Sequence, residues 1–211
     1  GDIREIVNHI NDYVSSPIDV VVGGPPCQGF SSANQQRIID DPRNELYKYF
    51  VTAIKAILPK FVVMENVKGM LSVANEVVED YQNIHETRNG IEYSYKVDYK
   101  LLNSVDFSVA QSRERLIYIA IRTDVVEKRH ITPDKIFEQI SANNKGNKRY
   151  LLKEALDFIK PLDAPRVKNM NDLDDVKTGK KIDVNTFKGN ENEYLRLING
   201  CREIPFLYNH K

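Results

Sequence analysis

The chain has 211 residues, enough for one large domain or for one domain and part of a second. Hydrophobic residues make up 41% and charged residues 28%, which is typical of a soluble globular protein. The 30 Lys and Arg balance the 30 Asp and Glu, so net charge does not indicate nucleic-acid binding, although a local basic cluster remains compatible with it. No apolar stretch approaches the roughly 20 residues that cross a membrane, and no signal peptide opens the chain, so we expect a cytoplasmic location without membrane contact.

Cysteines and histidines are too few and too scattered to indicate a disulfide framework or a metal site. Cys27 and Cys201 lie far apart, and none of the four histidines forms a metal-ligand pair with a cysteine or another histidine. We therefore predict no metal, and a reducing compartment suits the two thiols.

Periodic apolar spacing and β-branched runs predict alternating helices and strands in the first 122 residues. The expected helices are 3–14, 42–58 and 71–84, and the expected strands are 18–22, 61–64, 93–102 and 115–122. Asn89 and Gly90 break the pattern after the third helix. This order predicts an α/β fold with a mostly parallel sheet that is closed by a hairpin.

The pattern becomes less regular after Arg122. We expect a polar linker over 143–149 and a short amphipathic helix over 150–159, whereas 168–193 shows no strong period. The sequence therefore predicts two parts, 1–122 and 123–211.

Cys27 follows the first predicted strand, within Pro25-Pro26-Cys27-Gln28-Gly29-Phe30-Ser31. In open α/β sheets, ligands bind at the carboxyl ends of the strands. Two prolines stiffen the backbone before the thiol and small residues follow it, which favours an accessible cysteine. The alternative is that Cys27 is a small buried hydrophobe, as most free cysteines are.

Two further polar clusters follow strand ends or turns: Glu65-Asn66 and Arg113-Glu114-Arg115. Parallel strands end at one edge of a sheet, so Cys27 and Glu65 are expected to lie close together. The hairpin is expected to bring the arginines to the same site. Each cluster alone has a structural alternative. A glutamate at a strand end is often a helix cap or a solvated charge, and an Arg-x-Arg is often a surface ladder.

Together these segments resemble the central motifs of the bacterial, restriction-modification type of cytosine-C5 DNA methyltransferases. The matching segments, in the family's order, are Pro26-Cys-Gln-Gly-Phe-Ser31, Glu65-Asn66-Val67 and Gln111-Ser-Arg113-Glu-Arg115. Gly1-Asp2-Ile3 is similar to the family's adenine-binding motif, and 41–46 resembles the end of its active-site loop. The resemblance covers residues 1–122 and implies a Rossmann-like fold that uses S-adenosylmethionine.

The resemblance implies methyl transfer to C5 of a cytosine that is flipped out of double-stranded DNA. C5 is a weak nucleophile, and a thiolate that adds at C6 turns the ring into a reactive enamine. The resemblance assigns this thiolate to Cys27. Glu65, if burial keeps it protonated, would hold a proton toward N3. Arg115 would donate to O2 with Arg113 nearby, and Asn66 would support the Glu65 turn.

The resemblance also implies contacts with the methyl donor and with DNA. The expected donor contacts are Asp2, Ile3, Pro26 and Leu46. The loop from Gln28 to about Asn44 would close over the flipped base. The expected loop contacts with DNA are Gln28, Ser31 and Arg37.

The chain lacks the glycine-rich strand-turn, Phe-x-Gly-x-Gly, with which the family begins, and also the family's closing motifs. We therefore expect a fragment or one subunit of a larger enzyme, with a missing segment or partner subunit supplying the glycine-rich donor motif. The strand over 18–22 would then be a bare apolar sheet edge, so we expect weak donor binding and self-association or a partner. Residues 123–211 would contain a linker and the start of the variable, target-recognition region.

Two other functions stay open. A close relative with the same residues would methylate tRNA, although Gln28-Gly29-Phe30-Ser31 is more similar to the DNA enzymes. A non-catalytic remnant or subunit would only bind nucleic acid, which the intact Cys27, Glu65 and Arg115 disfavour. The recognised DNA sequence and an accompanying restriction nuclease are not indicated by the residues.

Overall fold

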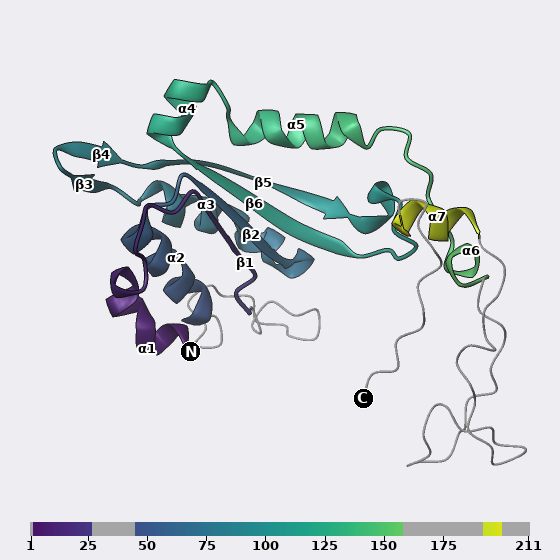
Figure 1. The fold of residues 1–211 in the computed structure, drawn as a ribbon, viewed down its shortest axis with the longest axis horizontal. Coiled ribbons are helices and arrows are strands. Elements are labelled where there is room, and N and C mark those ends of the chain that lie inside the picture. The colour runs from purple at the N-terminus through teal and green to yellow at the C-terminus, as the bar shows by residue number, and fades with distance from the viewer. Residues whose placement is uncertain (1, 27–44, 158–191, 200–211) are drawn as a thin grey trace, which may run out of the picture.

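A four-stranded sheet lies between two layers of helices in the computed structural model, which describes residues 2–26, 45–157 and 192–199 (Figure 1). The strand order is β1 (Val20–Gly23), β2 (Phe61–Val67), β6 (Glu114–Arg122) and β5 (Tyr95–Asn103). β1 and β2 are parallel, whereas β6 runs antiparallel to both β2 and β5. The predicted α/β class and the closing hairpin are confirmed, and the described sheet is mixed, with one parallel and two antiparallel pairings.

One face of the sheet packs against α2 (Glu45–Ile57) and α3 (Ala74–Gln82) (Figure 1). Alternate residues of β2 and β6 point into this layer, because successive side chains of a strand face opposite ways. The fully buried members of the cluster include Tyr47, Ile54, Met64, Tyr81, Leu116 and Tyr118. α2 ends before Leu58, which adopts a left-handed φ of 55°, and Pro59 follows, as the sequence predicts.

The other face of the sheet is covered by α4 (Thr123–Arg129) and α5 (Pro133–Asn143) (Figure 1). Their core consists of Ile119, Ile121, Val125, Val126 and Phe137. The sequence analysis did not predict these two helices. The layer that covers the sheet therefore continues past Arg122 to Asn143.

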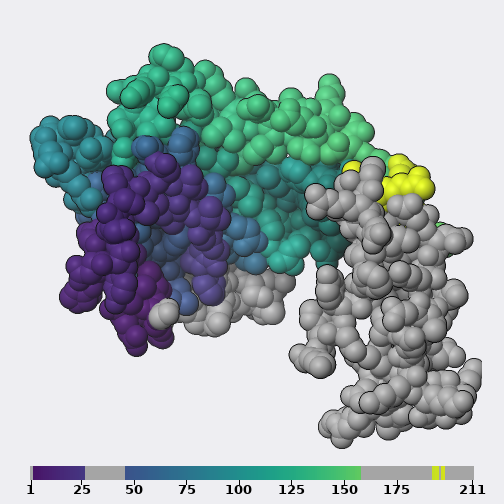
Figure 2. Space-filling model, viewed as in Figure 1, coloured from purple at the N-terminus to yellow at the C-terminus, as the bar shows by residue number. Residues whose placement is uncertain are grey.

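Several elements differ in detail from the predicted ones. The helix expected over 3–14 consists of α1 (Ile3–Ile6) and a 3-10 segment, η1 (Val7–Asp12). Likewise, η4 (Lys68–Val73) precedes α3 where one helix was expected. A hairpin of β3 (Glu86–Arg88) and β4 (Ile91–Tyr93), absent from the prediction, projects at one end of the molecule (Figure 2).

Short helices lie in and around the connection between β5 and β6. η5 (Ser104–Phe107) lies directly after β5, and α6 (Leu152–Leu156) and α7 (Glu193–Asn199) lie near the turn between β5 and β6 (Figure 1). Ala110 in this turn clusters with Tyr150, Ala155 and Tyr194. In the described part of the chain, no helix is long and apolar enough to cross a membrane.

Candidate active site

The parallel pairing of β1 with β2 brings the backbone before Cys27 beside the Glu65-Asn66 pair. Gly23 pairs with Met64 in register, so Gly24 lies beside Glu65. A Cβ on Gly24 would lie 3.1 Å from Glu65 Oε2, so the Glu65 carboxylate lies close against the backbone at this position. Cys27 itself lies outside the described residues, as do Gln28, Ser31 and Arg37.

Asn66 joins the two strand ends. Its side chain is buried, at 4% exposure, and its Nδ2 donates a hydrogen bond to the Pro25 carbonyl oxygen at 3.0 Å. Its Oδ1 accepts from the Val67 backbone N–H at 2.9 Å. These two bonds connect the backbone that leads into Cys27 with the turn after Glu65. The role of Asn66 in supporting the Glu65 turn stays a prediction.

Glu65 and Arg115 form an ion pair, with Nε 2.6 Å from Oε1. Arg115 opposes Val67 in the antiparallel register and Glu65 opposes Ile117, so the two side chains are diagonal neighbours on one sheet face. Nη1 of Arg115 also donates to the Glu114 carbonyl oxygen at 2.8 Å. The guanidinium is therefore fixed from two sides.

Glu65 is not buried as the sequence analysis expects. Its side chain is 45% exposed, whereas that of Arg115 is 24% exposed. The position at the end of β2, beyond the helices that cover the sheet, leaves the carboxylate open to solvent. The burial on which the expected protonation of Glu65 depends is therefore not present among the described residues.

Arg113 lies in the turn before β6 and is exposed. Its backbone N–H donates to Asn103 Oδ1 at 3.2 Å and to Ser104 Oγ at 3.1 Å. The sequence analysis did not identify Asn103 or Ser104. An asparagine directly after a strand and before a short helix is a capping signal that could have found the first of them.

The four expected donor contacts belong to three elements on the α2 side of the sheet. Asp2 caps α1, where the Arg4 side chain and backbone N–H donate to its carboxylate and lower its pKa to about 2. Ile3 begins α1, which packs beside α2 (Figure 1). Leu46 is half-buried in the first turn of α2, and Pro26 is exposed beyond β1.

The contact between α2 and β1 is close. A Cβ on Gly23 would lie 2.3 Å from the Phe50 ring, so only glycine lets the helix approach the strand end to this distance. Leu46 lies one helical turn before Phe50 and shares its side of α2. Leu46 and Pro26 therefore border the same region, at the carboxyl end of β1.

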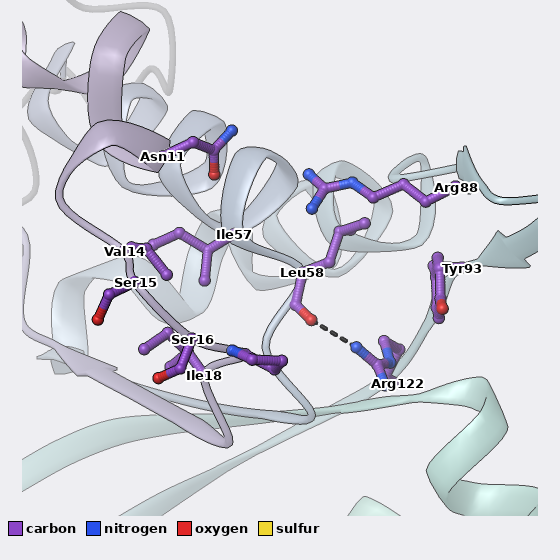
Figure 3. A pocket seen from close by; sticks show the side chains of 11 residues that line it. Asn11, Val14, Ser15, Ser16, Ile18, Ile57, Leu58, Arg88, Tyr93 and Arg122 are labelled. Carbon is purple, nitrogen blue, oxygen red and sulfur yellow. Dashed lines mark hydrogen bonds between the residues drawn. The ribbon is translucent and has the colours of Figure 1, made fainter.

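A cavity of about 400 Å³ lies at the opposite end of the sheet, near the start of β1 and the end of β6 (Figure 3). Its two arginines contact the end of α2: Arg88 donates to the Ala56 carbonyl oxygen, and Arg122 donates to that of Leu58 at 2.6 Å. Arg122 also pairs with Asp124 at 2.6 Å. These arginines cap helix carbonyls and lie far from the Glu65–Arg115 pair.

Comparison with known proteins gives a consistent result. A family described as C-5 cytosine-specific DNA methylase matches residues 1–202. Type II methyltransferase M.FnuDI of Fusobacterium nucleatum is 45% identical over 125 residues, which are 59% of this chain and 34% of that protein. Type II methyltransferase M.AquIA of Picosynechococcus sp. is 39% identical over 130 residues, which are 58% of this chain and 52% of that protein.

A solved structure from E. coli, described as a DNA modification methyltransferase encoded within a prophage, has a similar fold. It aligns with a TM-score of 0.50 and 23% identity over 78% of this chain and 42% of that chain. The chain thus spans about a third to a half of the length of these relatives. The family match extends past residue 122, where the sequence resemblance ends. It confirms the family expected from the motifs, and the chain belongs to the C-5 cytosine-specific DNA methylase family.

Proposed function

We propose that the protein transfers a methyl group from S-adenosylmethionine to C5 of a cytosine flipped out of double-stranded DNA. The observation that carries this proposal is the Glu65–Arg115 pair, at 2.6 Å, beside the backbone that leads into Cys27. Asn66 holds that backbone through the Pro25 carbonyl oxygen. The carboxyl group and the guanidinium thus lie beside the segment that leads into the proposed nucleophile, Cys27, an arrangement that suits addition to a pyrimidine ring.

In the proposed reaction, the Cys27 thiolate adds to C6 of the flipped base and forms a carbon–sulfur bond. The negative charge that develops on the ring is stabilised by a proton held at N3 by Glu65 and by donation from Arg115 to O2. The enamine carbon C5 would take the methyl group from the sulfonium sulfur of the donor, which would leave as S-adenosylhomocysteine. Loss of the C5 proton to a base and expulsion of the Cys27 thiolate then restore the aromatic ring. Arg113, in the adjoining turn, adds positive charge that favours the Cys27 thiolate.

Glu65 and Arg115 are paired with each other in the absence of a base. A cytosine that enters between them has to replace the 2.6 Å contact by contacts with N3 and O2. Both side chains are partly exposed, so this exchange requires no opening of the core.

The donor would occupy the region bordered by Pro26 and Leu46, with Asp2 and Ile3 near its adenine. When bound, S-adenosylmethionine supplies an electrophilic methyl group on a sulfonium. The close approach of Phe50 to Gly23 supports this assignment, because it sets the first turns of α2 against the carboxyl end of β1. Asp2 would offer an acceptor to the adenine amine while Arg4 keeps it ionised.

The full-length product of the source gene tests this function. We expect tritiated methyl incorporation into unmethylated DNA, with the label in 5-methylcytosine and none in tRNA. Cys27→Ser should abolish incorporation, whereas the matched Cys201→Ser should retain it. Label in tRNA alone would favour the tRNA alternative. Equal nucleic-acid binding by both variants without any methyl transfer would favour a non-catalytic binding protein.

We further propose that residues 1–122 form the central part of a catalytic domain, which α4 and α5 extend to Asn143, and that the rest of 123–211 forms a linker and the start of the variable, target-recognition region. The chain spans about a third to a half of the length of its relatives, which supports a further segment or partner subunit that supplies the rest of the enzyme. Sequencing the source gene on both sides should reveal a glycine-rich strand-turn upstream. A start codon directly before Gly1 and a stop codon after Lys211 would contradict a single longer chain.

A further inference from the structure

The turn that carries Arg113 is fixed by side chains at the end of β5. Asn103 Oδ1 accepts from the backbone N–H of Arg113 at 3.2 Å and of Val105 at 3.3 Å, and its Nδ2 donates to Ser112 Oγ at 3.2 Å. Ser104 Oγ accepts from the Arg113 N–H at 3.1 Å and donates to the Gln111 carbonyl oxygen. One amide side chain therefore holds both the start and the end of the connection between β5 and β6.

This connection determines the position of Arg115. Asn103 pairs with Glu114 in the antiparallel register, one residue before the strand position of Arg115. A slip of one residue in an antiparallel pair moves every side chain to the other face of the sheet. Arg115 would then leave the face that it shares with Glu65. The bonds of Asn103 to Arg113 and Ser112 oppose such a slip where β6 begins.

The outer side of the same connection contacts residues from the C-terminal part of the chain. The Ala110 N–H donates to the Tyr194 hydroxyl of α7 at 3.4 Å, and Asn147 donates to the Asp106 carbonyl oxygen at 3.2 Å. Tyr150 and Tyr194 pack edge to face with their ring centroids 5.1 Å apart. These contacts support the outer part of the turn, whereas Asn103 alone bonds directly to both Ser112 and Arg113 in the described residues.

We propose that Asn103 is a positioning residue for methyl transfer. It fixes the 108–113 turn, which carries Arg113, so that Arg115 at the start of β6 presents its guanidinium group to Glu65, and it touches neither the base nor the donor. This role rests on the proposed function of the Glu65–Arg115 site. It predicts that loss of Asn103 impairs the step in which charge develops on the ring, more than it impairs DNA binding.

The test compares three variants of the full-length protein. Asn103→Ala removes all three bonds, and Asn103→Asp keeps the acceptor Oδ1 but loses the donor to Ser112. Asn75→Ala is the matched control, because Asn75 lies exposed on α3 and its Oδ1 accepts one hydrogen bond, from Tyr99 at 3.2 Å. Hydrogen exchange of the 104–113 segment and steady-state methyl transfer are measured for each.

For Asn103→Ala we expect faster exchange of the Val105 and Arg113 amides and a kcat that falls by roughly 10- to 100-fold, as for misplacement of a catalytic group by about 1 Å. KM for DNA should stay near that of the parent protein. Asn103→Asp should recover part of both losses, and Asn75→Ala should match the parent. The partial rescue separates positioning from a general loss of stability.

Unchanged exchange of the Arg113 amide in Asn103→Ala, or a kcat equal to that of Asn75→Ala, would overturn the proposal. If Asn103→Ala does not fold, Asn103→Asp decides by the same two measurements. A parent protein that methylates no DNA would refute the proposed function itself. The exchange data would still show in that case whether Asn103 anchors the turn.

Discussion

Glu65 forms an ion pair with Arg115 in which both side chains are partly exposed, so we expect it to contribute little to stability and, in the proposed reaction, much to catalysis. We expect Glu65→Gln to lower kcat on the order of 10²- to 10⁴-fold, the range for loss of a general acid. The free energy of unfolding should change by less than about 1 kcal/mol, as for exposed ion pairs. Methyl-transfer kinetics and urea denaturation measure the two effects.

The matched control for Glu65→Gln is Glu86→Gln, which removes the carboxylate of another partly exposed pair, 3.2 Å from Lys55. This control should keep the parent kcat, because the pair lies at the β3–β4 hairpin. A Glu65→Gln protein with the parent kcat would exclude Glu65 from the proposed chemistry. A large loss of stability would show instead that the pair is structural.

In contrast to Glu65, Asn66 is expected to contribute mainly to stability, because it is buried and bonded to backbone groups. Asn66→Ala leaves the Pro25 carbonyl oxygen and the Val67 N–H without the bonds at 3.0 and 2.9 Å. We expect the free energy of unfolding to fall by about 1–3 kcal/mol, the cost of buried polar groups that lose their partners. Urea denaturation of the parent and the variant checks this value.

Asn66→Asp is the sharper comparison, because it keeps the size and the acceptor of Asn66 but replaces the donor to Pro25 by a second oxygen. It should be at least as destabilising as Asn66→Ala at neutral pH. An Asn66→Asp protein as stable as the parent would contradict the idea that the bond from Asn66 to the Pro25 carbonyl oxygen fixes the backbone before Cys27.

At the residue scale, the sequence predicted that Glu65 and Arg115 lie close together but not how exposed they are. The proximity of Glu65 and Arg115 follows from strand order and the hairpin, both of which are visible in periodicity. Burial of Glu65 depends on which elements cover the end of β2, and that is a tertiary property. Asn103 was missed because its role comes from a turn whose partners are ten residues away.

At the scale of elements, the contact between α2 and β1 depends on one glycine. A Cβ on Gly23 would lie 2.3 Å from the Phe50 ring, and a stiff ring in a packed layer cannot move away without cost. We expect Gly23→Ala to lower the free energy of unfolding by about 1–3 kcal/mol, as for overpacking. Thermal and urea denaturation provide the measurement.

A second substitution isolates the cause. Phe50→Leu in the Gly23→Ala background removes ring atoms from the crowded site and should restore part of the lost stability. Phe50→Leu alone should be destabilising, because it leaves unfilled space. If the double variant is less stable than both single variants, the clash with Phe50 is not the cause.

The start of α4 gives a prediction about pH. Arg122 donates two hydrogen bonds to the Asp124 carboxylate, at 2.6 and 3.0 Å, and lowers its pKa below the ordinary value of 3.8. The stability from this pair is therefore complete above the ordinary pKa of aspartate and is lost as the pH falls through the lower, folded-state value. Asp124→Asn should be less stable than the parent at pH 7, by less than about 1 kcal/mol because the site is partly exposed.

The difference between the parent and Asp124→Asn should shrink as the pH falls below the ordinary aspartate pKa, and urea denaturation from pH 7 to pH 2 follows it. Glu127→Gln serves as the control, because it removes an exposed carboxylate from the same helix, α4. A difference that grows on acidification would contradict the assigned direction of the Asp124 pKa.

Elements that were predicted well have strong periodic signals, and those that were missed are short or lie past an expected boundary. β1, α2, β2 and β6 coincide with apolar runs that begin or end at Pro, Gly or charged residues. The β3–β4 hairpin was interpreted as a break only, although Asn89 and Gly90 have the positive φ values, 51° and 76°, of a tight hairpin turn. α4 and α5 lie past the boundary expected at Arg122, although Ile136, Phe137 and Ile140 of α5 have helical apolar spacing.

At the scale of the whole molecule, β1 is an edge of the sheet in the described part of the chain. It has β2 as its one neighbour there, and Val20 and Val22 are 51% and 70% exposed. Exposed apolar edge strands favour pairing with another strand. We therefore expect the chain to associate with a second copy or with a partner strand through β1.

Val22→Lys tests this edge, because a charged side chain on an edge strand opposes strand pairing. Analytical ultracentrifugation should show that the weight-average mass of the parent chain rises with concentration, and that the mass of Val22→Lys rises less. Gln82→Lys, which adds the same charge at an exposed position of α3, should behave like the parent. A parent chain that stays monomeric at every concentration and binds S-adenosylmethionine tightly at one site would contradict association through β1. The donor site would then be complete without a further strand beside β1.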